Sequence, residues 1–217
     1  MAINLQKITL EKKGDTHFID LSKQVGPITD EINIHLNWSN GKKIGLFGSL
    51  FSKDIDLDLG CFYELNNGER NVIDGLQFSG GRGGAKDRKT RQGRYVSEPW
   101  VWHAGDDRGT SSGSGEDIII NPAGISDLKR VVIYCFIYEG AARWKETNGI
   151  VTVKVPGTAE IEVQMGAQSS VQKFCAIAEV LFSSQSIEVK KLVTFHNSHA
   201  ECDKKYGWGL KWSAGSK

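Results

Sequence analysis

Apolar and polar residues alternate along most of this chain with a period of two. In the stretch EINIHLNW, the residues Ile32, Ile34, Leu36 and Trp38 alternate with polar residues, so they share one face of an extended strand. Similar short runs are IDLDLGCFYEL, NVIDGLQF, GIVTVKV, AEIEVQM and IEVKKLVTF. Together with the N-terminal runs and YGWGLKW, the pattern predicts about a dozen short strands separated by Gly, Asn and Ser.

Two runs are apolar at nearly every position, RVVIYCFIY (residues 130–138) and FCAIAEVLF (residues 174–182). Strands of this kind have both faces covered, so we expect them in the middle of a sheet. The helical signal is weak, since only GAARWKET (residues 140–147) could form a turn or two. The sequence therefore predicts an all-β fold, a two-sheet antiparallel β-sandwich.

The composition fits this fold class. The chain has 217 residues, a formal net charge of +1, and 25 Gly against 4 Pro, which suits one domain over residues 1–217 rich in turns. The N-terminus lacks an apolar signal segment, and no run approaches the roughly 20 apolar residues needed to span a bilayer. We therefore expect a cytoplasmic protein, and its four well-separated cysteines favour buried free thiols in a reducing compartment.

Residues 79–99, SGGRGGAKDRKTRQGRYVSEP, break the strand pattern because they are rich in Gly and basic residues. We expect a long flexible loop inserted between two strands. It lacks the Gly-Lys-Ser/Thr of a P-loop and the interleaved aromatic residues that would stack on bases, which makes nucleic-acid binding the weaker interpretation. An acidic partner protein is the other alternative. The candidate partner-binding residues are Arg82, Lys86, Arg88, Lys89, Arg91 and Arg94.

Two distant segments concentrate carboxylates. In DIDLDLG (residues 54–60), Asp54, Asp56 and Asp58 share one strand face at a spacing of roughly 7 Å. In GDDRGTSSGSGEDIIIN (residues 105–121), four acids surround a Gly/Ser spacer. Carboxylates gathered in a pocket repel one another unless a cation lies among them. The alternative for DIDLDLG is a solvated strand face protected by charge.

Oxygen ligands on a flexible loop suit Ca²⁺, which takes six to eight of them with tolerant geometry. The pattern is not that of an EF-hand, because Gly60 follows Asp58 too late and strands flank the site. A metal-dependent hydrolase using the same carboxylates with Mg²⁺ or Mn²⁺ is an alternative, although no Ser-His-Asp or Cys-His signature is present. His196, His199 and Cys202 recur at three-residue intervals, but without a fourth ligand they favour a surface turn with one buried cysteine.

These motifs resemble the TerD-domain family of bacterial tellurite resistance and stress response. INIHLNWS is similar to the family's early strand, and IDLDLGCF to its Phe-Asp-Leu-Asp-Ala-Ser signature. HAGDDRGTSSGSGEDIIIN is similar to the His-x-Gly-Asp-Asn loop and the acid-rich segment that follows it. VVIYCFIYEGAARW and YGWGL resemble the central strand and the closing motif. The phrase IYEGAARW and the basic insertion are closest to a TerA-like branch.

The resemblance implies a non-enzymatic, cytoplasmic β-sandwich that binds one or two Ca²⁺ ions at one end. Its implied partners are other tellurite-resistance or stress-complex proteins, with peripheral membrane association through them. The metal ligands carried over are Asp56, Asp58, Asp106, Asp107, Glu116 and Asp117, with Glu139 and Asn121 as possible additions. The chain departs from the family pattern at Ser39, Gly113 and Gly115, where the family has Asp, so fewer or weaker sites are expected.

Overall fold

The computed structural model describes residues 6–24, 26–38, 55–75, 86–88, 90–105, 115–138, 141–166 and 168–213. These residues form twelve strands, two short α-helices and two 3-10 turns. The strands are β1 (Ile8–Leu10), β2 (Thr16–Asp20), β3 (Ile32–Asn37), β4 (Leu57–Leu65), β5 (Arg70–Asp74), β6 (Val101–His103), β7 (Gly115–Ile120), β8 (Leu128–Ile137), β9 (Ile150–Lys154), β10 (Ile161–Gln164), β11 (Phe174–Phe182) and β12 (Ser186–His196). The helical segments are η1 (Leu21–Lys23), η3 (Pro122–Gly124), α1 (Trp144–Thr147) and α2 (His199–Tyr206).

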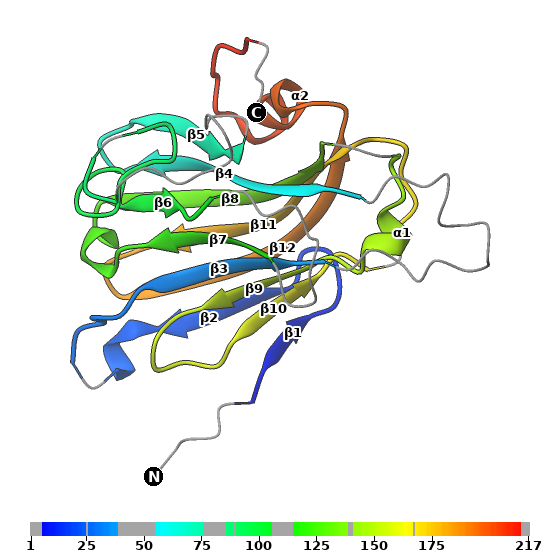
Figure 1. The fold of residues 1–217 in the computed structure, drawn as a ribbon. Helices are drawn as coiled ribbons and strands as arrows, with labels where there is room; N and C mark the ends of the chain where they lie inside the picture. Colours follow the sequence, from blue (N-terminus) through cyan, green and yellow to red (C-terminus); the bar gives the residue numbers. More distant parts are fainter. Residues whose placement is uncertain are drawn as a thin grey trace.

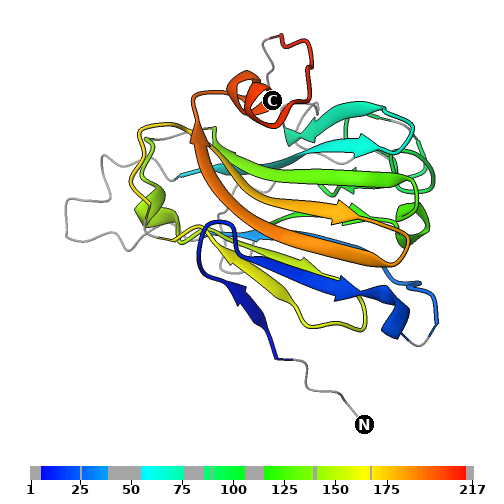
Figure 2. The same cartoon turned by 180° about the vertical axis from the view of Figure 1, so that it is seen from behind.

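The strands form two stacked six-stranded sheets, as the period-two pattern predicts (Figure 1). The first sheet has the order β1-β10-β9-β3-β7-β6, and the second has the order β2-β12-β11-β8-β4-β5. Neighbouring strands pair antiparallel except β1 and β10, which pair in parallel. Figure 2 shows the second sheet from behind, with α2 at one end of it. The predicted β-sandwich is confirmed.

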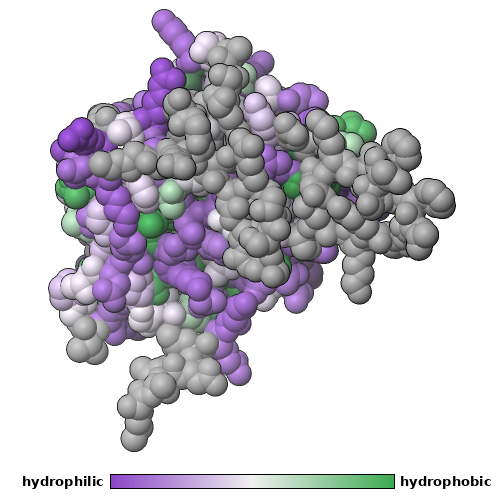
Figure 3. All heavy atoms as spheres, in the orientation of Figure 1, coloured by the Kyte–Doolittle hydropathy of each residue, from purple (hydrophilic) through white to green (hydrophobic). Residues whose placement is uncertain are grey.

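The main hydrophobic core fills the space between the sheets, because alternate residues of each strand point inward. Ile34 and Leu36 contribute from the first sheet and Leu57, Leu59 and Cys61 from the second; all five are fully buried. On the outer side of the first sheet the described surface is largely hydrophilic (Figure 3). The first sheet therefore has one apolar face and one solvent-exposed face, which explains the regular alternation of apolar and polar residues along its strands.

A second apolar cluster covers the outer face of the second sheet. Tyr134 and Phe174, on the adjacent central strands β8 and β11, pack there against residues of α2 and the C-terminal segment. Asp203 of α2 holds that segment in place, since its carboxylate accepts hydrogen bonds from the N–H groups of Gly209 and Leu210 at 2.7 and 2.8 Å. Because β8 and β11 are thus covered on both faces, their uniformly apolar sequences are explained.

The structure corrects two sequence-based expectations near the C-terminus. The segment with His196, His199 and Cys202 is not a surface turn, because residues 199–206 form α2. Cys202 is buried as expected, and all four cysteines are free thiols. The run YGWGLKW forms no strand, because Gly207 and Gly209 both adopt positive φ angles. In the described ranges, α1 and α2 have four and eight residues, too short to span a bilayer.

Replacing Ser198 with alanine should lower the free energy of unfolding by about 1 kcal/mol. Its hydroxyl caps α2 by accepting the Glu201 N–H at 3.3 Å, while Oε2 of Glu201 accepts the Asn197 N–H at 2.8 Å. Urea unfolding monitored by circular dichroism measures the change. The exposed Ser169, replaced by alanine, is the control, and equal midpoints for the two variants would contradict a capping role.

Candidate metal centre

The two acidic segments meet at one edge of β4. Strand β5 pairs with β4 only from Gly60 onward, so the backbone of Leu59 lies just beyond its partner. The Leu59 N–H donates instead to Oε2 of Glu116, on β7 of the opposite sheet, at 2.6 Å. The Leu59 carbonyl lies 3.0 Å from Nε2 of His103, on β6. Two side chains from the first sheet therefore complete the hydrogen bonding of a strand in the second.

The hydrogen bonds of His103 define its tautomer. Nδ1 accepts a hydrogen bond from the Gly105 N–H at 3.1 Å, so Nδ1 carries no proton. Nε2 then carries the proton and donates it to the Leu59 carbonyl, which makes the ring neutral in this arrangement. Oε2 of Glu116 lies 3.6 Å from Nε2. A neutral imidazole does not compensate the negative charge of Glu116, whose side chain is fully buried.

Asp58 brings a second carboxylate into the interior at this end of the molecule. It is fully buried, so it does not belong to a solvated strand face. Strand alternation places its side chain on the face of β4 opposite to that of Leu59. The pKa of the nearby Cys135 thiol is raised well above its usual range, chiefly by burial, then by Cys175, and further by the charges of Glu116 and Asp58. Both carboxylates thus act on one buried thiol.

The described residues that flank the remaining predicted acids, 103–105 on one side and 115–117 on the other, lie close together. The Gly105 N–H contacts His103, and the Ala104 N–H donates to the Asp117 carbonyl at 2.8 Å. Residues 106–114 lie outside the described residues, and with them Asp106 and Asp107. The flanking residues nevertheless fix both ends of this segment beside Glu116. The Tyr138 N–H donates to the Asp56 carbonyl at 3.1 Å. The predicted candidate Glu139, which follows Tyr138 in the sequence, is also outside the described residues.

The side chains of two predicted ligands, Asp117 and Asn121, do not point toward Glu116. Asp117 follows Glu116 on a strand, so its side chain lies on the outer face, where Oδ1 is 2.9 Å from Nδ1 of His35 and accepts a hydrogen bond from Asn33 at 3.0 Å. Burial tends to raise the pKa of Asp117, but these two partners outweigh it and lower the pKa. Asn121 lies at the far end of β7, roughly 16 Å along the strand from Glu116, and it caps η3 by accepting the Ala123 N–H. The structure does not bring either side chain to the Glu116 position.

The donor set of this site consists of carboxylate oxygens, which suits a hard cation such as Ca²⁺. Within the described ranges, no group of three or more His, Cys, Asp or Glu side chains is arranged to hold a metal ion. A complete site would therefore need ligands from residues 106–114 beside Asp58 and Glu116. The contact between His103 and Gly105 was not predicted from the sequence, although both residues stand just before the Asp106-Asp107 pair.

Within the basic segment, the structure describes residues 86–88 and 90–99. Residues 90–99 fold back on β6, with Gly93 forming an isolated bridge to Trp102. Lys86 forms an ion pair with Glu31 at 2.7 Å and lies 5.0 Å from the centre of the Tyr95 ring. The Arg94 side chain donates to the Asp87 carbonyl at 3.1 Å. Among the predicted partner-binding residues, Arg88 and Arg91 are exposed, whereas Arg82 and Lys89 lie outside the described residues.

No family model matches the sequence. The tellurium resistance protein TerA of an Alcaligenes species is 37% identical to this chain over 218 residues, which is 99% of this chain and 60% of TerA. This chain therefore spans less than two thirds of that relative's length.

Two solved structures share the fold. A homologue of the telluride resistance protein TerD from Streptomyces coelicolor A3(2) covers 77% of this chain and 90% of its own, with a TM-score of 0.51 and 16% identity. The protein of unknown function SAV2460 covers 85% and 99%, with a TM-score of 0.55 and 12% identity. At these identities the likeness shows the fold alone. This chain is therefore related in sequence to the tellurium resistance protein TerA along almost its whole length, and its fold is that of a TerD homologue.

Proposed function

We propose that this chain is a non-enzymatic Ca²⁺-binding module of a bacterial tellurite-resistance or stress-response system. The ion would link the Asp56–Asp58 segment of the second sheet to the acidic segment that runs from Gly105 to Glu116. The observation that carries this proposal is the contact between Oε2 of Glu116 and the Leu59 N–H, directly beside the buried Asp58. The 37% identity to the tellurium resistance protein TerA and the resemblance of the motifs to the TerD-domain family support it.

The physical basis is the charge of the buried carboxylates. Asp58 and Glu116 are both removed from water, and His103 is neutral in the observed arrangement. Buried like charges either take up protons or need a cation close by. Bound Ca²⁺ supplies that positive charge, and Asp106 and Asp107 are the additional ligands that we propose.

The surroundings of this site suggest how binding is transmitted. Glu116 and His103 already join the two sheets through the backbone of Leu59. Neutralising the carboxylates would strengthen this junction and fix residues 105–117 at the end of the sandwich. We propose that this end then presents a surface to other tellurite-resistance or stress-complex proteins in the cytoplasm, with membrane association only through those partners.

Isothermal titration with Ca²⁺ and Mg²⁺ tests this function. Purified chain treated with a chelator should bind Ca²⁺ in the micromolar range, with Mg²⁺ binding at least tenfold weaker. Asp58→Asn and Glu116→Gln should each weaken Ca²⁺ binding at least tenfold, because affinity follows the number of carboxylates. Glu160→Gln, at an exposed ion pair with Lys154, is the matched control.

The same titration, together with assays of phosphoester turnover and of nucleic-acid binding, separates the proposed module from the alternatives. A preference for Mg²⁺ or Mn²⁺ together with turnover of a phosphoester would replace it with a metal-dependent hydrolase. Binding of DNA or RNA that weakens steeply with salt, and that is lost when residues 82–94 are deleted, would assign the basic segment to nucleic acid. Equal Ca²⁺ affinity of Glu116→Gln and the unsubstituted chain would exclude Glu116 from the site.

A further inference from the structure

Strand β2 (Thr16–Asp20) forms one edge of the second sheet. It pairs antiparallel with β12, and within the described residues no strand pairs with its other side. Figure 2 shows β2 along the lower edge of this sheet. Three strands, β12, β11 and β8, separate β2 from β4. The β2 edge therefore shares no residue with the proposed metal centre.

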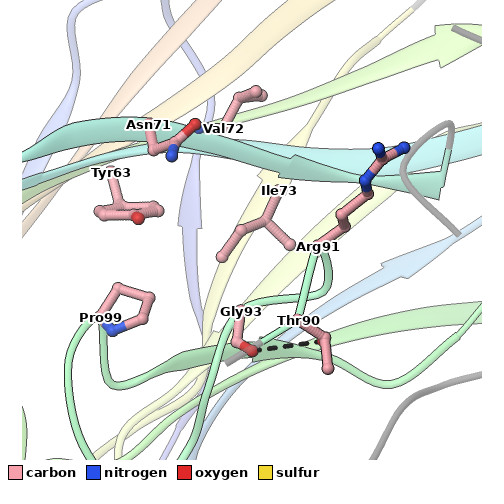
Figure 4. Close-up of a pocket in the computed structure, with 8 residues that line it drawn as sticks. All are labelled: Tyr63, Asn71, Val72, Ile73, Thr90, Arg91, Gly93 and Pro99. Atoms are coloured by element: carbon pink, nitrogen blue, oxygen red, sulfur yellow. Dashed lines mark hydrogen bonds between the residues drawn. The ribbon is translucent and has the colours of Figure 1, made fainter. Parts of the chain in front are cut away.

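The opposite side of the sandwich, at β5 and β6, is covered by the chain itself. The Arg94 N–H donates to the Val101 carbonyl of β6 at 2.9 Å. The turn before Arg94 lies against β5 (Figure 4), where a Cβ on Gly93 would be 2.7 Å from Cδ1 of Ile73. Residues 90–94 thus cover that side, whereas no described segment covers the β2 edge in this way.

The register of β2 shows which of its peptide groups face the open side. Just beyond the strand, the Leu21 N–H donates to the Gln185 carbonyl at 2.8 Å, in the same register as the β2–β12 pairs. Hydrogen-bonded pairs alternate along an antiparallel ladder, so the odd-numbered residues of β2 bond to β12. The peptide groups of Thr16, Phe18 and Asp20 therefore face away from β12 and are available to another strand.

The side chain at the centre of this edge is apolar and exposed. Phe18 is 59% exposed, whereas its neighbour Ile19 points into the main core. Native edge strands are usually protected by charged side chains, a proline or a bulge, and the centre of β2 has none of these. An open edge of five residues with a central aromatic side chain suits pairing with a further strand.

We propose that β2 pairs with β2 of a second copy of this chain, antiparallel and centred on Phe18, so that the second sheets of the two copies become continuous. The strand is self-complementary in this register. The two Phe18 residues lie opposite each other and exchange both backbone hydrogen bonds, while the Asp20 N–H of each copy donates to the Thr16 carbonyl of the other. Facing aromatic side chains at such positions stabilise a sheet.

The charges on the outer face favour the same register. Lys190 of β12 lies opposite Thr16, and none of the described residues forms an ion pair with it. In the paired strands, Asp20 of the other copy lies on the far side of Thr16, about 10 Å from Lys190 between Cα atoms. Its side chain is 32% exposed beside Lys23, so Lys190 can reach it. A parallel arrangement would instead bring the two Asp20 side chains together.

Sedimentation equilibrium over a range of protein concentrations, in chelator so that Ca²⁺ plays no part, tests this pairing. We expect a monomer–dimer equilibrium in the unsubstituted chain. Phe18→Pro should weaken the dimer at least tenfold, because it removes an N–H that bonds to the other copy. The monomer keeps its ladder, since this N–H does not face β12. Circular dichroism checks that the variant is folded.

Two further variants separate the β2 edge from general association. Phe18→Lys keeps the backbone N–H but places two positive charges opposite each other, and it should also weaken the dimer at least tenfold. Val171→Lys, at a 93% exposed apolar residue before β11, is the matched control and should leave the dimer unchanged.

Amide hydrogen exchange locates the interface. Exchange at Phe18 should slow as the protein concentration rises, whereas His17, which already bonds to β12, should change little. A chain that stays monomeric up to millimolar concentration would overturn the proposal. A dimer that both Phe18 variants leave intact, or that leaves exchange at Phe18 unchanged, would overturn it as well.

Discussion

Glu64→Gln should lower the free energy of unfolding by about 3 kcal/mol at neutral pH, and most of this difference should disappear in acid. Glu64 is a carboxylate with only 2% of its side chain exposed, and three cations surround it. Its Oε1 accepts hydrogen bonds from Arg70 and Lys129, both at 2.9 Å, and its Oε2 accepts one from Arg130 at 2.6 Å. A neutral amide leaves these three positive charges without their shared partner.

The position of Glu64 explains why the expected loss is large. Arg70 on β5 and Arg130 on β8 are its direct cross-strand neighbours, where opposite charges stabilise a sheet. The guanidinium of Arg130 also lies 4.0 Å from the centre of the Trp208 ring, so the network reaches the C-terminal segment. Losing one member of a buried charged network typically costs 3–5 kcal/mol; the lower end applies because Lys129 is 54% exposed.

The pH dependence follows from the pKa of Glu64. Burial tends to raise this pKa, but hydrogen bonds from Lys129, Arg130 and Arg70 outweigh burial and lower it to about 2 from 4.5. A lowered pKa in the folded state stabilises the protein above the unfolded value. That stability is lost as the pH falls from about 4.5 toward 2. The shift corresponds to about 3 kcal/mol as an upper bound, given the solvent around the partners.

Urea unfolding at several pH values between 7 and 2 measures this difference. Glu160→Gln is the control, because its exposed ion pair with Lys154 should contribute at most about 1 kcal/mol. A constant difference between Glu64→Gln and the unsubstituted chain across this range would mean that the charge of Glu64 is not the source of its effect.

Most of the fold follows from local patterning. The alternation of Ile32, Ile34 and Leu36 specifies a strand with one buried face, and β3 has this burial. The uniformly apolar runs become the central strands β8 and β11. Which strands become neighbours is not local information, because it depends on how the two sheets pack across the core. The parallel pairing of β1 with β10 is an example.

Helix α2 has a local capping signal in the sequence, but the weak helical periodicity of the segment hid it. Ser198 and Glu201 have the spacing of a capping box, and Gly207 ends the helix with a φ of 77°. The segment lacks a clear apolar stripe, so its periodicity is weak. Its stability comes instead from tertiary contacts, such as the buried Cys202 on the outer face of the second sheet. Packing of this kind is not visible in sequence periodicity.

At the candidate site, the sequence identified which segments meet but not how each side chain points. Strand alternation sends Glu116 inward and Asp117 outward once β7 begins at Gly115. Because the sequence does not show that β7 begins at Gly115, Glu116 and Asp117 were predicted to act as one pair of ligands. The roles of His103 and Leu59 depend on β5 ending short of Leu59, which is a feature of register between strands. Sequence patterns carry little information about where a neighbouring strand stops.

Removing Ca²⁺ should lower the melting temperature of this chain by roughly 5–10 °C relative to the protein in Ca²⁺ at a hundred times its Kd. A ligand that binds only the folded state at that concentration stabilises it by about 2.7 kcal/mol, and each kcal/mol shifts the melting temperature of a protein of this size by about 2–4 °C. Without the ion, the carboxylates of Asp58 and Glu116 both remain buried. Amide exchange at Leu59 and Gly105, whose N–H groups contact Glu116 and His103, should then become faster.

Glu116→Gln should reverse the order of stability between the two conditions. The amide oxygen of glutamine can still accept the Leu59 N–H, while one buried negative charge is removed. In chelator, therefore, the variant should melt above the unsubstituted chain, because one carboxylate charge fewer is kept out of water. In saturating Ca²⁺ it should melt below the unsubstituted chain, because a ligand of the ion is lost. Differential scanning calorimetry with and without chelator shows whether the two melting curves exchange places. If Glu116→Gln lies below the unsubstituted chain by the same amount in both conditions, its carboxylate acts only through Leu59 and no ion is held there.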